Sequence, residues 1–281
     1  MAAGQSKLSQ KIDALMEQAS EALVQRRYFE CERLGIDAMR RALGALDFDR
    51  VARIALPLQE ARRQIRDMAV DTGNVVCVNG ELPMGAGLKA GMYLLSPPRV
   101  GVDGRLLREE ATRREVPVVV LVREPPTRQG LWPIVAVGPV TVRTRIDPPA
   151  MASVPAAKAT AAKAGGRAAA AAAGAKPAGK AKAAAVVPKS APPVPPVEWL
   201  LLACEALGDE AIESLSPGLS LVARVLALAE RLEAVPDHEK LHQRLEEAAR
   251  EAARIPPKKR AAAKPTGREA IDDDRNARAD E

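Results

Sequence analysis

The stretch that decides the fold is VPVVVLVR, which spans residues 116–123 and is followed closely by Pro125 and Pro126. It is a nearly continuous apolar run bounded by prolines. Runs of this length are typical of a strand that is buried on both faces of a sheet. The sequence therefore predicts a buried strand here.

Shorter elements flank this strand on both sides. The sequence predicts short strands at 75–79 and 91–96, a helix at 103–115 capped by Asp103, and one or two strands within 131–146. The resulting order β-β-α-β-β indicates a small α/β domain over residues 71–150. If the runs at 91–96 and 116–123 are parallel strands, the helix between them is a right-handed crossover.

Residues 6–70 carry a helical period. Apolar side chains recur at intervals of three and four residues along three successive stripes. The stripes are Leu8, Ile12, Leu15, Ala19 and Leu23; Leu34, Ala38, Met39, Ala42 and Leu46; and Val51, Ala55, Leu58, Ile65 and Ala69. Pro57 lies inside the third stripe and predicts a kink or a break there. We expect an up-down-up helical bundle with short turns.

A second helical module is predicted at 198–255. Its three helices are expected to end near Gly208-Asp209, to span 219–235 and to span 237–254. The preceding residues 151–197 are mostly Ala, Lys, Gly and Pro and include no acidic side chain. Such a segment buries too little apolar area to offset its ordering entropy, so we predict disorder. The charged tail, residues 256–281, is also predicted to be disordered.

The predicted fold class is therefore α+β with several modules: an N-terminal helical bundle, a small α/β domain, a disordered basic linker and a C-terminal three-helix module. The composition agrees with small modules rather than one large enzyme domain. Hydrophobic residues make up 47% of the chain, but it contains only two Trp, two Tyr and two Phe. Alanine supplies much of the rest and buries little area.

Charge and cysteine usage narrow the functional classes. The formal net charge is +6, and residues 151–197 alone carry seven basic and no acidic side chains. Cys31, Cys77 and Cys204 lie far apart, which excludes a disulfide framework and a Cys-x-x-Cys metal site. The N-terminus does not resemble a signal peptide, and no apolar run is long enough to span a membrane. We therefore expect a cytoplasmic protein, and its composition resembles that of proteins from bacteria with GC-rich genomes.

One helical segment resembles a known repeat. Within residues 21–38, Tyr28, Cys31 and Ala38 stand where tetratricopeptide repeats have an aromatic residue, a small residue and an alanine. The resemblance implies a helical hairpin whose aromatic side chain fills the groove between the two helices. Gly35 departs from the pattern, because a large apolar residue is usual there, and no second copy follows at 34 residues.

His238-Glu239-Lys240-Leu241-His242 has the H-E-x-x-H spacing and resembles the zinc metalloprotease signature. On a helix both histidines lie on one face as candidate metal ligands, and Glu239 is placed to polarise a bound water. The motif opens its predicted helix, however, and no third ligand follows. The alternative is a solvated first turn capped by Asp237.

Two further features point to anion binding. Residues 85–90 read G-x-G-x-x-A, which resembles a dinucleotide-binding loop, but the spacing to the preceding strand and the following sequence favour a glycine turn. In α/β sheets, ligands bind at the carboxyl ends of the strands. The candidate ligand-binding residues in the loops at that edge are Arg99, Arg123, Arg128 and Trp132. The alternative is a set of ordinary charged loops stiffened by proline.

The basic linker resembles the Ala/Lys/Pro tails of linker histones and of some bacterial nucleoid proteins. The residues that would meet nucleic-acid phosphates are Lys158, Lys163, Arg167, Lys176, Lys180, Lys182 and Lys189. Such binding would be weak, independent of sequence and steeply dependent on salt. The alternative is a soluble spacer.

From the sequence alone we predict a non-enzymatic adaptor that binds protein partners through its helical modules and needs no cofactor. Non-specific DNA association through the basic linker is one alternative. The other is a small anionic ligand, or an enzymatic reaction, at the edge of the α/β domain. The sequence indicates neither a partner nor an oligomeric state.

Overall fold

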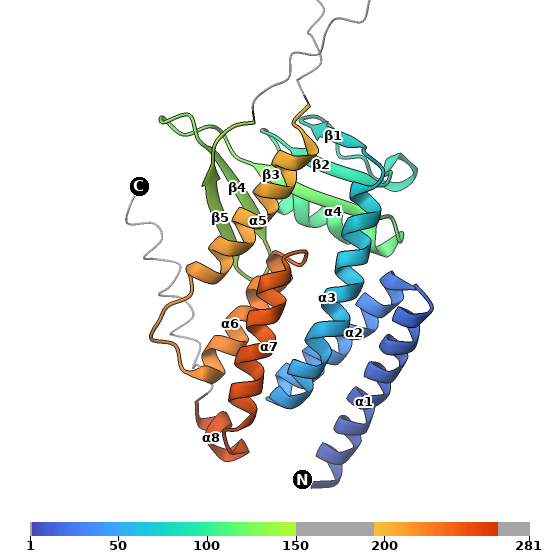
Figure 1. Cartoon of the computed structure of the whole chain (residues 1–281), viewed down its shortest axis with the longest axis vertical. Coiled ribbons are helices and arrows are strands. Elements are labelled where there is room, and N and C mark those ends of the chain that lie inside the picture. The colour runs from blue at the N-terminus through green and yellow to red at the C-terminus, as the bar shows by residue number, and fades with distance from the viewer. Residues whose placement is uncertain (1, 150–193, 264–281) are drawn as a thin grey trace, which may run out of the picture.

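The structure is a computed structural model that describes residues 2–149 and 194–263 (Figure 1). It has helices at both ends of the chain and a five-stranded mixed sheet between them, which confirms the predicted fold class. Most of the predicted linker and most of the predicted tail, residues 151–193 and 264–281, lie outside the described residues.

The three predicted N-terminal helices are present. They are α1 (Ala2–Val24), α2 (Tyr28–Gly44) and α3 (Phe48–Val70). Short turns join them, and Asp47 caps α3 by accepting a hydrogen bond from the Arg50 amide at 3.4 Å. Helix α3 continues through Pro57, so the proline does not break it.

The central part of the chain forms the sheet in the predicted order. Its elements are β1 (Val75–Val78), η1 (Gly85–Gly87), β2 (Gly91–Leu95), α4 (Gly101–Arg113), β3 (Val118–Arg123), β4 (Trp132–Val137) and β5 (Thr141–Ile146). The strands lie in the order β1-β2-β3-β4-β5. Strands β1, β2 and β3 are parallel, whereas β4 and β5 are antiparallel additions. Helix α4 joins β2 to β3, as expected for a crossover between parallel strands.

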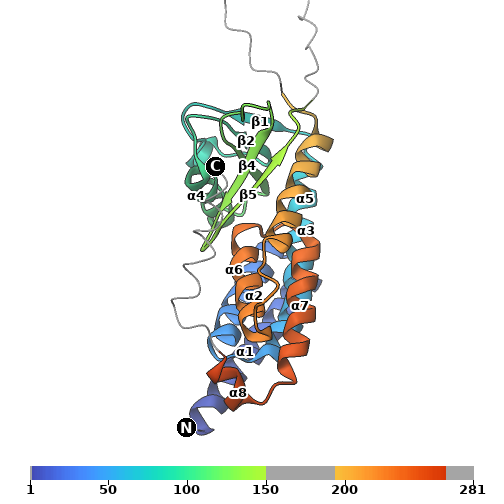
Figure 2. The same cartoon turned by 90° about the vertical axis from the view of Figure 1, so that its left-hand side faces the viewer.

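Both faces of the sheet are covered, which explains the apolar run in β3. Val118 and Val122 pack with α4 residues, whereas Val119 and Leu121 point to the opposite face. Figure 2 shows α4 on one side of the sheet and α3 and α5 on the other. Alternation along the strand sends successive side chains to these two layers. The predicted central strand is thus confirmed.

The C-terminal part has the three predicted helices and one more. They are α5 (Val197–Glu213), α6 (Leu221–Ala234), α7 (Glu239–Ala253) and the short α8 (Pro257–Ala262). Helix α5 does not end at Gly208-Asp209, where the sequence predicted its end. Helix α8 lies within the segment 256–281 that the sequence predicted to be disordered.

Gly208 lies inside α5 and makes a close packing contact there; it does not end the helix. A Cβ atom on Gly208 would lie 2.0 Å from Cγ of the His238 ring, which is buried. The bare backbone of α5 therefore allows this imidazole to lie directly against the helix. Glycine is usual just past a helix end, so the sequence alone suggested termination here.

The three parts of the chain share one apolar core. Helix α3 packs along α7, and α5 packs on β4 and β5. The largest buried cluster accordingly includes Phe48 and Leu58 from α3, Leu121 from β3, Leu200 from α5 and Leu245 from α7. The C-terminal helices complete the bundle that the N-terminal helices begin, and they also cover the sheet (Figure 1).

We predict that Gly208→Ala lowers the free energy of unfolding by about 1–3 kcal/mol, because the new methyl group overpacks the buried His238 ring. Urea denaturation followed by circular dichroism measures this change. The matched control is Gly44→Ala, since a Cβ atom at Gly44 meets nothing within 4 Å. Equal stability of Gly208→Ala and the parent protein would contradict the assignment of this contact.

Candidate functional site

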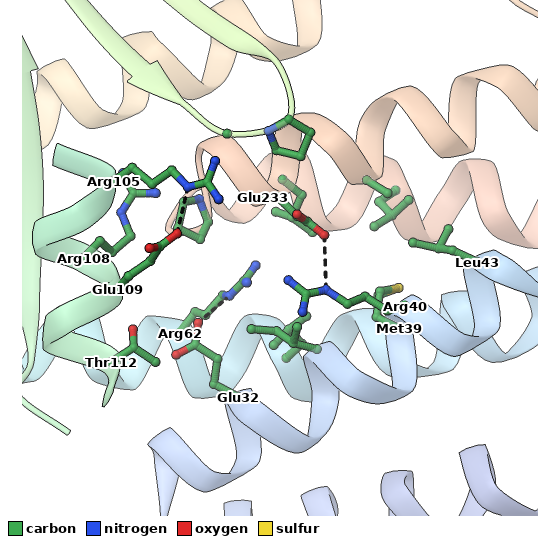
Figure 3. A pocket seen from close by; sticks show the side chains of 18 of the residues that line it. Glu32, Met39, Arg40, Leu43, Arg62, Arg105, Arg108, Glu109, Thr112 and Glu233 are labelled. Atoms are coloured by element: carbon green, nitrogen blue, oxygen red, sulfur yellow. Dashed lines mark hydrogen bonds and ion pairs between the residues drawn. The ribbon is translucent and has the colours of Figure 1, made fainter. Parts of the chain in front are cut away.

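A cleft with a volume of about 450 Å³ opens where the three parts of the chain meet (Figure 3). Its walls come from α2, α3, α4, the turn between β4 and β5, α6 and α7. We call it the central cleft. It is lined by residues as distant in the sequence as Glu32 and Leu245, so only the packing of all three parts creates it.

One end of the central cleft is rich in arginine, and we call it the arginine end. Its charged side chains are Arg62, Arg105, Arg108, Arg113, Glu32 and Glu109. Arg62 Nε donates to Glu32 Oε1 at 2.9 Å in an ion pair that is nearly inaccessible to solvent. Arg105 Nε donates to Glu109 Oε1 at 2.7 Å on the surface of α4. The four arginines outnumber the two carboxylates that line this end, although Arg113 also pairs with Glu110, outside the lining.

Arg108 is the most deeply placed arginine of α4. Its Nη1 donates to the Ala234 carbonyl at 2.9 Å, where α6 ends. Burial lowers the pKa of the Arg108 guanidinium, and burial raises the pKa of the neighbouring Asp237 carboxyl, an effect that Arg108 opposes. Charges interact more strongly in such a poorly hydrated place than on the surface.

The other end of the central cleft is apolar. Ile36, Met39 and Leu43 form one face of α2, at i, i+3 and i+7, and Leu232 of α6 and Leu245 of α7 also line the cleft. Figure 3 places Met39 and Leu43 at the opposite end from Arg108, Glu109 and Thr112. We call this part the apolar end.

An ion pair connects the two helices beside the apolar end. Arg40 Nε of α2 lies 3.6 Å from Glu233 Oε1 of α6, and both side chains are exposed (Figure 3). Both residues also line the cleft, so it changes along its length from a charged end to an apolar end, and this ion pair crosses it between α2 and α6.

The predicted crevice at the carboxyl edge of the sheet exists, but most of the predicted residues lie outside it. A cleft of about 510 Å³ there is lined by Arg99 together with Glu124, Arg143 and Arg145. Arg99 is already engaged, since Nε donates to the Gly80 carbonyl at 2.6 Å and Nη1 lies 3.6 Å from Asp103 Oδ1. Of the four predicted ligand-binding residues, only Arg99 lines this cleft.

Arg123 and Trp132 lie together on the other face of the sheet. The Arg123 guanidinium stacks 4.4 Å from the centre of the Trp132 ring, and its Nε donates to Ser96 Oγ at 2.9 Å. Alternation along β3 sends Arg123 to the face opposite Glu124. Arg128 is exposed in the loop before β4. The four residues therefore do not converge.

The G-x-G-x-x-A stretch forms the short helix η1 and a turn rather than the start of a long helix. The Gly85 amide donates to Glu110 Oε1 at 3.3 Å, so a carboxylate of the protein occupies that donor. Strand β2 begins at Gly91. These features agree with the glycine-turn interpretation.

Both histidines of the H-E-x-x-H segment are buried, so the prediction of a solvated first turn is wrong for them, although Lys240 is exposed. The exposed fractions of His238 and His242 are 2% and 1%. His238 itself, not Asp237, is the N-cap residue of α7, and no side chain caps the helix. The two histidines fill space between helices, since His238 packs on Gly208 and His242 Nε2 lies 3.1 Å from the Pro236 carbonyl.

Two carboxylates lie near His238, and an arginine binds Glu239. His238 Nε2 lies 3.3 Å from Glu205 Oε2 and 3.4 Å from Asp209 Oδ1, and Glu239 Oε1 accepts a hydrogen bond from Arg66 at 2.9 Å. Among residues 2–149 and 194–263, no group of three or more His, Cys, Asp or Glu is arranged to hold a metal ion.

The three cysteines are free thiols. Burial raises the pKa of Cys31 to about 11 and that of Cys204 to about 12, and burial also raises the pKa of Cys77. Because the thiolate is the reactive form, these cysteines are poor nucleophiles at neutral pH.

The remaining candidate residues, Lys158, Lys163, Arg167, Lys176, Lys180, Lys182 and Lys189, lie outside the described residues. DNA association through them stays a prediction. Within the described part of the chain, no helix is long and apolar enough to cross a lipid bilayer.

The central cleft was not found from the sequence. Its one local signal is the pair Ile36 and Leu43, which flank the core stripe of α2 and line the cleft together with Met39 of that stripe. The arginines carry no comparable signal, because Arg62 and Arg108 come from helices that are far apart in the chain.

The chain matches no protein-family model, and comparisons with curated proteins and with solved structures also find no significant match. The resemblance to tetratricopeptide repeats receives no support from them and stays a prediction. In the structure, residues 21–38 cover the end of α1 and the first part of α2, where Tyr28 is half-buried.

We predict that His242 makes the fold less stable in acid. Burial lowers the pKa of His242 to about 3, compared with about 6.5 for an accessible histidine. Below pH 6.5 only the unfolded chain binds this proton, so stability falls as the pH falls, by about 1.4 kcal/mol per pH unit down to pH 3. Between pH 7 and pH 5 this residue therefore removes about 2 kcal/mol.

Urea denaturation of the parent protein and of His242→Gln at pH 7 and pH 5 tests this prediction. The variant is less stable at pH 7 but loses about 2 kcal/mol less than the parent on acidification. Glu247→Gln, at an exposed position of the same helix, is the control. The same loss in the parent and in His242→Gln would disprove the prediction.

Proposed function

We propose that the protein binds an amphiphilic anion in the central cleft, with the acidic group at the arginine end and the apolar body at the apolar end. The observation that carries this proposal is the change in chemistry along one continuous cleft, from Arg62 and Arg108 to Met39 and Leu43. A ligand with a single chemical character would match only half of this surface.

The arginine end suits a carboxylate or a phosphate. Guanidinium groups donate paired hydrogen bonds to such groups, and charge-assisted bonds are roughly twice as strong as neutral ones. Arg105 and Arg108 are three residues apart on α4, so both face the cleft, and Thr112 adds a hydroxyl one turn beyond Arg108. These side chains offer several donors from one rigid helix.

The apolar end suits a hydrocarbon chain or a similar body. A volume of about 450 Å³ lies in the range of sites for small organic ligands, roughly 300–1,000 Å³. Each methylene group that leaves water for the surface of Ile36, Met39 and Leu43 contributes about 0.8 kcal/mol. The apolar body would therefore supply affinity, and the arginines would set its orientation.

A binding role fits the side chains of the cleft better than a catalytic role. Thr112 is the only hydroxyl-bearing residue in the described lining, which includes no His or Cys. Because the cleft joins all three parts of the chain, a bound ligand would also stabilise their packing. Partner binding by the helical surfaces stays a prediction beside this proposal.

Isothermal calorimetry with decanoate tests the proposal directly. We expect decanoate to bind, and we expect butyrate and decanol to bind at least about tenfold more weakly, since each lacks one of the two matched features and tenfold corresponds to 1.4 kcal/mol. Equal binding of decanoate and decanol would contradict the role of the arginine end.

Two cleft variants and one control locate the ligand. Arg105→Ala should weaken decanoate binding about tenfold through loss of a charge-assisted contact, and Leu43→Ser should weaken it through loss of apolar contact. Arg244→Ala is the control, because Arg244 is also exposed and pairs with a glutamate of its own helix, Glu247 at 2.9 Å, but lies outside the cleft. An equal effect of Arg105→Ala and Arg244→Ala would place the ligand elsewhere.

A further inference from the structure

The last described helix, α8, is fastened at the apolar end of the central cleft. Arg260 Nη1 donates to the Leu46 carbonyl at 3.1 Å, and the Arg260 guanidinium lies 5.6 Å from the centre of the Phe48 ring. Leu46 follows three residues after Leu43, which lines the apolar end. The chain therefore leaves the described structure at Ala263 close to this end of the cleft.

The residues beyond Ala263 are long enough to enter the central cleft. Ile271 lies eight positions after Ala263, and an extended chain over that interval reaches about 26 Å. The α2 wall of the cleft, from Leu43 back to Glu32, spans twelve residues and is about 16 Å long. The whole cleft thus lies within reach of residues 264–281.

The order of chemistry in this segment matches the order of chemistry in the cleft. Ile271 is the only large aliphatic residue within 264–281, and Asp272, Asp273 and Asp274 follow it directly. A chain that enters from α8 meets the apolar end first and the arginine end second. Ile271 would therefore meet Met39 and Leu43, and the three carboxylates would continue toward the arginines.

We propose that Ile271-Asp272-Asp273-Asp274 occupies the central cleft of the same molecule, so that an external amphiphilic anion binds by displacing it. This inference rests on the proposed function and names its regulation. The segment presents an apolar side chain followed by acidic groups, which is the chemistry proposed for the ligand. Because the segment belongs to the same chain as the cleft, its binding is intramolecular, so weaker contacts suffice than for a separate molecule.

Self-occupancy predicts a measurable change in ligand affinity. The apparent dissociation constant equals the intrinsic one divided by the fraction of open cleft, so a segment bound in about 90% of molecules weakens the ligand about tenfold. The full-length variant Asp272→Asn/Asp273→Asn/Asp274→Asn should therefore bind decanoate about tenfold more tightly than the parent, and Ile271→Ser should act in the same direction.

A matched control comes from the same segment. Asp280→Asn/Glu281→Gln removes two acidic groups that do not follow Ile271, and it should leave the decanoate affinity within about twofold of the parent value. An equal gain in this control and in the triple variant would show a general charge effect and would overturn the inference.

A second measurement, photo-cross-linking, tests where the segment lies when no ligand has been added. The full chain carrying the photoreactive residue benzoylphenylalanine at position 270 should, on irradiation, cross-link to peptides from α2 or α6. Addition of decanoate should reduce this cross-link. Cross-links only to other parts of the molecule, or none, would overturn the inference.

The two proposals fail in different ways. If decanoate binds neither the parent nor the triple variant, the proposed function is wrong and the regulation named here falls with it. If decanoate binds both with equal affinity and position 270 does not cross-link to α2 or α6, the proposed function stands and the self-occupancy is wrong.

Discussion

The packing of α3 along α7 is the contact on which the rest of the structure depends. It brings Leu58 and Leu245 into one core and is fastened by the ion pair between Arg66 and Glu239 at 2.9 Å. Without this contact, the apolar face of the N-terminal helices would be exposed to solvent, and the C-terminal helices would not be held against the rest of the protein. Because the central cleft lies between α2, α4 and α6, its shape is a consequence of this packing rather than of any single element.

Two arginines of the cleft wall are held in place by partners within the protein. A buried charge is costly unless it is paired, and Arg62 is paired with Glu32 in nearly complete burial. Breaking such a pair by removing one partner typically costs about 3–5 kcal/mol, so each side chain fixes the other. Arg108 uses the free carbonyl of Ala234 at the end of α6 in a similar way. Arg62 and Arg108 therefore have defined positions in the cleft wall.

The sequence predicts an element correctly where a short-range apolar period sets its structure. It fails where a contact with a distant segment sets the position of a residue. The helices of residues 6–70 and the buried strand β3 follow from local patterns alone. Gly208 was taken as a helix end because glycine is usual there, but the ring of His238, which comes from another part of the chain, explains it. His238 and His242 were predicted as candidate metal ligands or as part of a solvated first turn, but both are buried between helices. Arg123 lies at the carboxyl end of β3, as expected, but its guanidinium stacks on Trp132 and does not join Arg99 in the cleft at that edge.

The sequence by itself determined the kinds of element and their order, because apolar periodicity and proline or glycine boundaries act over a few residues. The parallel pairing of β2 with β3 was a condition in the sequence analysis, and the structure shows it. It also showed that residues 151–197 carry only positive charge. The tertiary structure decided which faces meet, and therefore that Arg62, Arg108, Met39 and Leu43 line one cleft. No local sequence pattern relates these four residues. They come together only when helices from separate segments bury their apolar faces against one another.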